Sequence, residues 1–210
     1  MHLTNTDILQ QERRYRGHLI NSLGGFKSAL LIGTKSDQGH ENLAIFSSFF
    51  HIGADPALCG IVVRPTTPGL NTLHHILSTS HYTLNHIAPS FYQQAHQCSA
   101  KYEDGISEFN EVGLTPLYLP GIHAPFVAES RIRFACELVQ KIDIKLNGTT
   151  ILIGQIIHIE VPDEVLGNDG FIDIEKASSV TCSGLDSYHV TQKIGRLSYA
   201  KTDQPPMESK

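Results

Sequence analysis

Two long stretches in which apolar and polar residues alternate constrain the fold more than any other part of the chain. In the first, RIRFACELVQKIDIK, one face of an extended strand carries four apolar residues: Ile132, Phe134, Cys136 and Leu138. In the second, TTILIGQIIHIEVP, one face carries five: Ile151, Ile153, Ile157, Ile159 and Val161. This period of two predicts two long β-strands, and the intervening LNGT suits the turn between them. Gly154 interrupts the second strand, which indicates a bulge, a bend or a close backbone approach.

Shorter strands precede this pair. Their sequences are FKSALLIGTK, LAIFSSFFHIG, ALCGIVVRP and HYTLNHIA, and the first three are separated by the turn-like segments KSDQGHEN and ADP. Helical patterns run from Thr4 to Leu23, around Leu70 to Leu77, and through the short segments PSFYQQAHQCSA and SEFNEVG. At least six strands with a few inserted helices predict a mainly β (α+β) chain, a β-barrel with peripheral helices.

The length of 210 residues suits one domain with a sizeable core. We expect residues 1–23 to form a helix packed on the barrel and residues 24–200 to form the barrel domain itself. Residues 201–210 are polar and rich in Pro, so we expect a disordered tail.

Charge and residue spacing argue against several classes of function. The net charge of −5 gives no basic field for nucleic acid or an anionic membrane. No apolar run reaches the roughly 18 to 20 residues of a membrane span, and the first residues lack the pattern of a signal peptide, so we expect a cytoplasmic protein. The four cysteines lack CxxC spacing and the histidines are scattered, so no metal site is predicted. Cys59 and Cys136 fall in predicted strands, which favours small buried apolar residues.

Several catalytic motifs are missing from the sequence. There is no GxGxxG after a strand, no GxxxxGK[ST] loop, no GxSxG elbow and no HExxH. We therefore assign no catalytic acid or base. If the protein is an enzyme, a cofactor carries the reactive atoms.

Hydroxyl, amide and guanidinium groups gather where predicted strands end. They are Ser47, Ser48, Arg64, Thr66, Thr67, Asn71 and Thr72. An arginine, several hydroxyls and a helix start near Asn71 suit a phosphate, while Phe49 and Phe50 offer ring surface. Taken singly, these residues suit helix caps, solvated charge and core packing. Taken in order, they indicate a site for flavin mononucleotide (FMN).

Seven short motifs follow one another between about residues 10 and 202. NLAIFSSFF supplies Asn42, Ala44, Ser47 and Phe49, the next segment supplies Arg64 and Thr72, and YTLN ends at Asn85. SEFNEVGLT, APFVAESRIRFACEL, ILIGQIIHI and GLDSYHVTQKIGRLSYAK come after them. In this order the chain resembles the flavin reductase-like, FMN-binding split-barrel family, which includes flavoredoxin and the reductase components of two-component monooxygenases.

The resemblance implies a split β-barrel, a homodimer, and FMN bound near the dimer interface. The residues that we expect to bind FMN are Asn42, Ala44, Ser47, Ser48, Phe49, Phe50, Arg64, Thr66, Thr67, Thr72 and Asn85. It also implies an oxidoreductase that passes electrons from NADH, NADPH or a protein donor through FMN to a small-molecule or protein acceptor. Thr149 stands where many stand-alone reductases of the family have the His of a GDH motif, which moves the expectation towards the flavoredoxin-like subgroup.

Two other functions fit the same residues. One is a non-catalytic flavin carrier or electron-transfer module, and the other is a structural dimer with an empty site. Tyr188 and His189 could approach the flavin ring, although interface packing suits them better. Because neighbouring side chains of a strand face opposite ways, we expect one residue of Ser47/Ser48 and one of Phe49/Phe50 to face the flavin.

Overall fold

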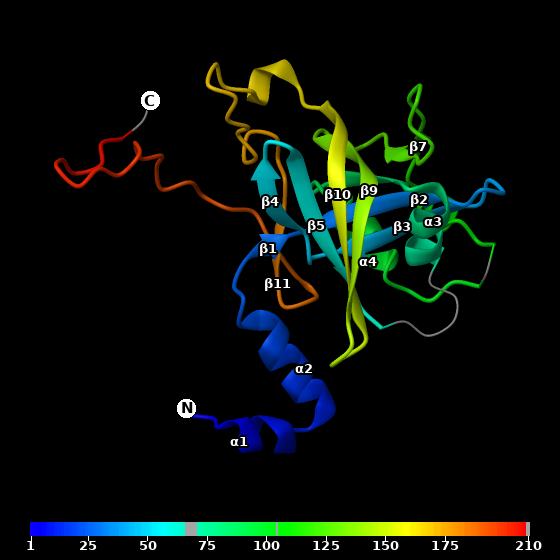
Figure 1. Cartoon of the computed structure of the whole chain (residues 1–210), viewed down its shortest axis with the longest axis horizontal. Helices are drawn as coiled ribbons and strands as arrows, with labels where there is room; N and C mark the ends of the chain where they lie inside the picture. Colours follow the sequence, from blue (N-terminus) through cyan, green and yellow to red (C-terminus); the bar gives the residue numbers. More distant parts are fainter. Residues whose placement is uncertain (66–70, 104, 209–210) are drawn as a thin grey trace.

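A computed structural model describes residues 1–65, 71–103 and 105–208 (Figure 1). Seven antiparallel strands form one curved sheet in the order β3-β2-β6-β9-β10-β5-β4. The strands are β2 (Leu30–Lys35), β3 (Glu41–Phe46), β4 (Phe50–Ala54), β5 (Ala57–Val63), β6 (His81–His86), β9 (Arg133–Ile144) and β10 (Thr149–Glu160). The predicted mainly β architecture is therefore confirmed.

Short helices and small strands surround this sheet (Figure 1). The helices are α1 (Asn5–Gln10), α2 (Arg13–Ser22), α3 (Asn71–Thr79), α4 (Tyr92–Gln97), α5 (Glu108–Val112) and the 3-10 turn η1 (Asp163–Val165). A three-stranded sheet contains β1 (Lys27–Ser28), β11 (Thr181–Ser183) and β12 (Ser187–His189), and a two-stranded sheet contains β7 (Pro116–Leu117) and β8 (Phe126–Val127). None of the described helices is both long and apolar enough to cross a membrane.

The N-terminal segment is two helices where the sequence predicts one. Thr4 and Asp7 form a capping box at the start of α1, and Gln11 is already extended. The Glu12 carboxylate then accepts the Arg14 and Tyr15 N–H groups at 2.9 Å and begins α2. Neither helix contains a buried residue, and the pair projects from the barrel instead of packing along it (Figure 1).

The C-terminal segment also leaves the barrel after β12 (Figure 1). Within it the Ser198 N–H donates to the Met207 carbonyl at 2.8 Å. The disorder expected from residue 201 onward stays a prediction.

The predicted strand LAIFSSFFHIG is divided between β3 and β4, which lie at opposite edges of the sheet. Residues 47–49 carry the chain from one edge to the other and belong to neither strand. Here the Ser48 hydroxyl donates to the Val62 carbonyl at 2.8 Å and accepts the Val62 N–H at 3.2 Å. One side chain thus satisfies both backbone groups of Val62 where no backbone strand is in place to do so.

The sheet is buried on both faces at its strand β2. Leu30 and Ile32 of β2 pack inside the barrel with residues of β5, β6, β9 and β10, whereas Leu31 packs against α4 and α5 on the other side. Cys59 and Cys136 are buried in the barrel interior as free thiols, as their places in the strands predict.

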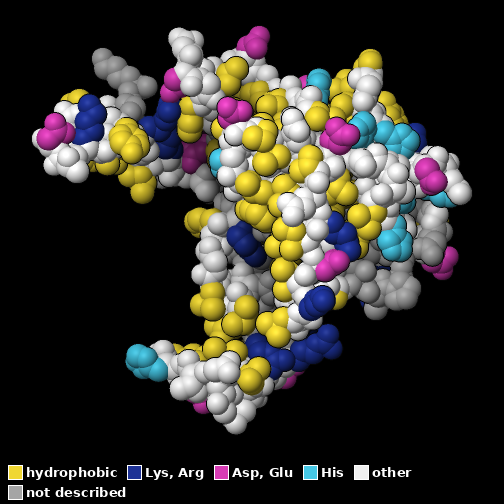
Figure 2. All heavy atoms as spheres, viewed as in Figure 1, with side chains coloured by type: hydrophobic (Ala, Val, Ile, Leu, Met, Phe, Trp, Pro, Cys, Tyr) yellow, Lys and Arg dark blue, Asp and Glu magenta, His cyan; other side chains and the backbone are white. Residues whose placement is uncertain are grey.

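The apolar stripe of β10 faces outwards. Ile157 is 39% exposed and Ile159 is 60% exposed, whereas Leu152 and Gly154 face the barrel interior. Val139 and Ile142 of β9 are exposed on the neighbouring strand. Figure 2 shows hydrophobic side chains gathered over this part of the surface. The apolar stripe predicted for β10 is therefore exposed at Ile157 and Ile159 and does not line the barrel interior there.

Gly154 lies where β10 passes close to the side chains of Tyr82 and Cys136. A Cβ added at this position would lie 2.0 Å from Tyr82 Oη and 3.0 Å from Cys136 Cβ. The strand pairing with β9 also shifts between Ile153 and Gly154. The structure therefore confirms both a bulge and the close approach that an interior strand glycine indicates.

We predict that Gly154→Ala lowers the free energy of unfolding by roughly 2 to 3 kcal/mol, because overpacking forces Tyr82 from its place. Urea denaturation followed by circular dichroism measures the change. Combining the substitution with Tyr82→Phe removes the nearest oxygen and should recover part of the loss. A double variant no more stable than Gly154→Ala alone would show that the hydroxyl contact is not the cause.

Candidate functional site

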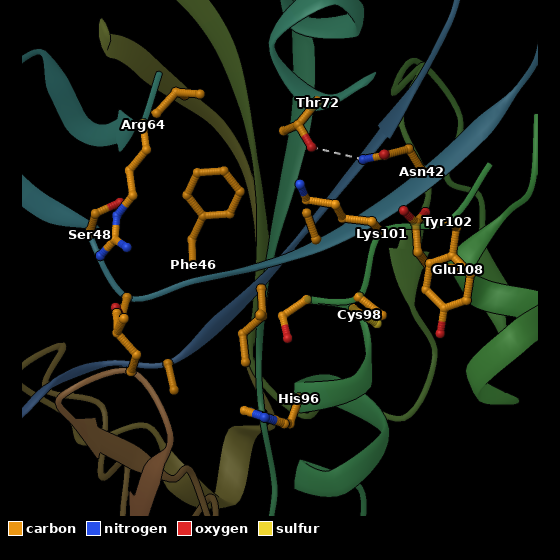
Figure 3. Close-up of a pocket in the computed structure, with 18 of the residues that line it drawn as sticks. Asn42, Phe46, Ser48, Arg64, Thr72, His96, Cys98, Lys101, Tyr102 and Glu108 are labelled. Atoms are coloured by element: carbon orange, nitrogen blue, oxygen red, sulfur yellow. Dashed lines mark hydrogen bonds between the residues drawn. The ribbon is translucent and has the colours of Figure 1, made fainter. Parts of the chain in front are cut away.

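A cavity of about 870 Å³ opens beside the edge strand β3 (Figure 3). Its walls come from β3, the crossing at residues 47–48, the end of β5, the start of α3, the segment after α4, and the loop between β11 and β12. The volume falls within the roughly 300 to 1,000 Å³ that is usual for cofactor sites. The barrel thus places segments far apart in the sequence around one hollow.

One side of the cavity carries a cation and hydroxyl groups. Arg64 follows the last residue of β5, and it lies on the same side of Figure 3 as Ser48. Arg64 Nη2 donates to Asn21 Oδ1 of α2 at 2.7 Å, so the projecting N-terminal helix holds the guanidinium in place. Ser47 lines the cavity next to Ser48. A guanidinium near hydroxyl donors suits an anionic group.

The opposite side carries a buried amide. Asn42 Nδ2 donates to Thr72 Oγ1 at 2.9 Å and to Thr34 Oγ1 at 3.2 Å (Figure 3). Thr72 lies in the first turn of α3, so these bonds join the helix start to β3. The Phe46 ring lies between this amide and Arg64 in Figure 3. The aromatic ring of Phe46 therefore separates the part of the cavity lined by the Asn42 amide from the part lined by the Arg64 guanidinium.

A carboxyl group also lines the cavity. Glu108 begins α5, and its Oε2 accepts the N–H of Leu43 at 2.9 Å, which satisfies a donor on the outer edge of β3. Burial raises the pKa of the Glu108 carboxyl, and the bond from Leu43 opposes that rise. Lys101 and Tyr102 line the cavity beside it (Figure 3).

The remaining wall holds His96, Cys98 and Tyr188. His96 Nδ1 and the Tyr188 hydroxyl are 2.9 Å apart and hydrogen-bonded. Burial raises the pKa of Cys98 to about 12, so its thiol stays protonated at neutral pH. Burial also raises the pKa of Tyr188 to about 12. These groups form a wall and are not activated nucleophiles.

Six of the eleven residues expected to bind the cofactor line the cavity. They are Asn42, Ala44, Ser47, Ser48, Arg64 and Thr72. Both serines line it, because residues 47–49 are not in a strand and strict alternation does not apply to them. Thr66 and Thr67 lie outside the described residues.

Three expected residues lie elsewhere in the fold. Phe49 packs in the barrel interior, where its ring centroid is 5.8 Å from that of Phe134. Phe50 begins the edge strand β4 and covers Gly60. Asn85 is fully buried, and it donates to the Leu31 carbonyl at 3.1 Å and accepts the Val127 N–H at 2.9 Å. Its amide joins the sheet to β8.

Phe46 and Glu108 are cavity residues that the sequence reasoning missed. Phe46 follows Asn42 and Ala44 at intervals of two, so strand alternation alone could have placed it on their face. For Glu108 the sequence carried no comparable signal, because only the docking of α5 on β3 brings it to the cavity.

A curved antiparallel sheet with a cofactor-sized cavity at one edge is the architecture of a split-barrel protein with a candidate ligand site. A family model described as a flavin reductase-like domain matches residues 23–176, and the chain belongs to this family. A crystal structure from Shewanella frigidimarina NCIMB 400, assigned to the flavin reductases with a split-barrel domain, is 46% identical. The match covers 95% of this chain and 100% of that chain, with a TM-score of 0.92.

Two more distant structures share the fold. Nitrilotriacetate monooxygenase component B from Bacillus cereus is 19% identical, with a TM-score of 0.82 over 94% of this chain and 98% of that chain. Flavoredoxin of Desulfovibrio vulgaris (Miyazaki F) is 20% identical, with a TM-score of 0.70 over 85% and 91%. The predicted family and split-barrel fold are therefore confirmed. Family membership supports a flavin-related oxidoreductase with a flavin cofactor.

We predict that Glu108→Gln changes how stability depends on pH. Folding raises the pKa of the Glu108 carboxyl. Such a group stabilises the folded state at low pH, and this contribution is lost as the pH rises through the folded-state pKa. The variant does not ionise, so its unfolding free energy relative to wild type should increase as the pH rises from about 4 to neutrality. Urea midpoints across this range measure the effect. Glu111→Gln, an exposed change on the same helix, is the control, and a relative stability that falls with pH contradicts the prediction.

Proposed function

We propose that this protein binds FMN in the cavity and acts as an FMN-dependent oxidoreductase. The observation that carries the proposal is the position of Arg64 and the Ser47–Ser48 hydroxyls on one side of a ring-lined cavity, with the Asn42 amide on the other. A molecule with a phosphate at one end and a flat heterocycle at the other fits this distribution of groups.

The phosphate would lie near Arg64, whose planar guanidinium can make two parallel bonds to phosphate oxygens. Asn71 and Thr72 bring the N-terminal turn of the nine-residue helix α3 to the cavity, and free N–H groups at a helix start favour an anion. Ala44, Ile45 and Phe46 would contact the ring system.

Bound flavin would supply the redox chemistry, by accepting a hydride or electrons and passing them on. The residues of this chain would bind the flavin, orient it and limit the access of water. We propose NADH, NADPH or a protein as the electron donor and a small molecule or a protein as the acceptor. A non-catalytic electron carrier is the second candidate, because Thr149 stands in place of the histidine of many reductases in the family.

We also propose that the protein acts as a homodimer in the cytoplasm. Val139, Ile142, Ile157 and Ile159 form an exposed apolar surface over β9 and β10, and a second copy of the chain would cover it. Members of this family are often dimers.

The proposal predicts that the purified protein binds FMN and shows a flavin absorbance spectrum. Anaerobic titration with NADH and then NADPH should bleach the bound flavin with at least one of them if the protein is a reductase. Flavin that binds but is bleached by neither nicotinamide would exclude both as donors and leave a protein donor or the non-catalytic carrier. Protein that is colourless and does not bind added FMN would contradict the proposed function.

We predict that Arg64→Ala weakens FMN binding by roughly tenfold to a hundredfold, because a charge-assisted contact is worth about 1.5 to 3 kcal/mol. Riboflavin lacks the phosphate, so its affinity should change little. Fluorescence quenching of each flavin measures both dissociation constants.

Arg131→Ala is the matched control, because it removes an exposed arginine that pairs with Glu164 away from the cavity. Equal losses of FMN and riboflavin affinity in Arg64→Ala would mean that Arg64 does not contact the phosphate.

A further inference from the structure

A chain of buried polar groups connects the cavity to a histidine outside it. Asn42 is 3% exposed and Thr34 is fully buried, and His75 of α3 is 7% exposed. Asn42 Nδ2 donates to Thr34 Oγ1 at 3.2 Å, and Thr34 Oγ1 lies 3.3 Å from His75 Nδ1. His75 also lines a second cavity of about 260 Å³ together with His40 and Glu41.

The number of available hydrogens determines the direction of each bond. The Asn42 amide nitrogen carries two hydrogens, which it donates to the hydroxyl oxygens of Thr34 and Thr72. The Thr34 hydroxyl then has its own hydrogen to donate in a fully buried position, and His75 Nδ1 is the acceptor beside it. With the hydrogens placed in this way, His75 is neutral and carries its proton on Nε2.

The same bonds determine which atom of Asn42 faces the cavity. Both hydrogens of Nδ2 are used within the protein, so Oδ1 is the polar atom that remains for a ligand in the cavity that Asn42 lines. A ligand would then have to present an N–H or O–H group at this point. Flavin has both kinds of donor, an imide N–H on its ring and hydroxyls on its ribityl chain.

We propose that neutral His75 is a positioning residue, which holds the Asn42 amide through Thr34 so that the amide oxygen accepts a hydrogen bond from the bound flavin. This inference rests on the proposed function. Protonation would place a hydrogen on His75 Nδ1, and the Thr34 hydroxyl would lose its acceptor. The network recovers its bonds only if the Asn42 amide rotates, which presents N–H groups to the cavity and opposes the donor of the ligand.

The surroundings of His75 favour its neutral form. Burial lowers the pKa of His75 most, followed by the nearby imidazoles of His40 and His74, whereas Asp37 raises it and His123 lowers it. Glu41 shares the smaller cavity, where its carboxylate accepts hydrogen bonds from Tyr118 and Ser107. The network should be intact at neutral pH and should fail as the pH falls through the lowered pKa of His75.

The test compares FMN dissociation constants of wild type and His75→Asn from about pH 5 to pH 8. The asparagine carboxamide can accept from Thr34 over this whole range and does not titrate. From about pH 8 to about pH 5 the affinity of the wild type for FMN should fall roughly threefold to tenfold more than the affinity of His75→Asn. This factor corresponds to the loss of about one hydrogen bond. The FMN phosphate itself titrates near about pH 6, so riboflavin is measured in parallel.

Three further measurements keep the test decisive. His51→Asn, an exposed change in β4 away from both cavities, should retain the wild-type pH profile. Thr34→Val should flatten the profile even if His75→Asn does not fold. Nitrogen-15 NMR of the flavin-free protein should find His75 protonated on Nε2 at neutral pH.

A proton on Nδ1 at neutral pH, or equal pH profiles for wild type and His75→Asn with both flavins, would overturn the inference. Absence of FMN binding to wild type at pH 8 would contradict the proposed function instead, and the NMR result would still report on the network.

Discussion

The bonds between the Ser48 hydroxyl and the backbone of Val62 are the contact on which the barrel and its cavity both depend. Strands β3 and β4 are neighbours in sequence but form opposite edges of the sheet, so the chain has to cross the barrel between them. During the crossing the backbone leaves the ladder, and Val62 would be left with two unsatisfied polar groups. The serine satisfies both at 2.8 and 3.2 Å. The same crossing forms the cavity wall beside Arg64, two residues beyond Val62.

Much of the barrel could be predicted from the sequence, because alternation and turn residues act locally. The strands β5, β6, β9 and β10 follow the predicted segments closely. The division of LAIFSSFFHIG could not be predicted, because Phe and Ile favour strands on either side of the crossing. The bond that holds the crossing joins Ser48 to Val62, a residue 14 positions further along the chain. The sequence also could not show whether the apolar face of β10 points into the barrel or away from it. Alternation shows that Ile157 and Ile159 share a face but not which face is inside.

The candidate site likewise contains some residues that could be predicted from the sequence and others that could not. Arg64, Thr72 and the two serines could be predicted, since they sit at strand ends and a helix start. Glu108 and His96 come from α5 and α4, which reach the cavity only when helices dock against β3. The ring wall was assigned to Phe49 and Phe50, but Phe46 provides it, because only Phe46 remains in β3 and keeps the register of Ala44.

Asn42 and Asn85 show that a buried amide is not by itself evidence of a ligand site. Both lie in strands and both are almost completely buried. Asn85 is in β6, with β2 and β9 on either side, and its amide bonds with Leu31 and Val127 hold the fold together. Asn42 is in the edge strand β3, so one side of it meets α3 and the cavity rather than another strand. There the two hydrogens of the Asn42 amide are donated to the hydroxyls of Thr34 and Thr72, and the amide oxygen remains available to a ligand. An edge strand covered by a helix can therefore offer a ligand a single oriented polar atom, which the centre of a sheet cannot do.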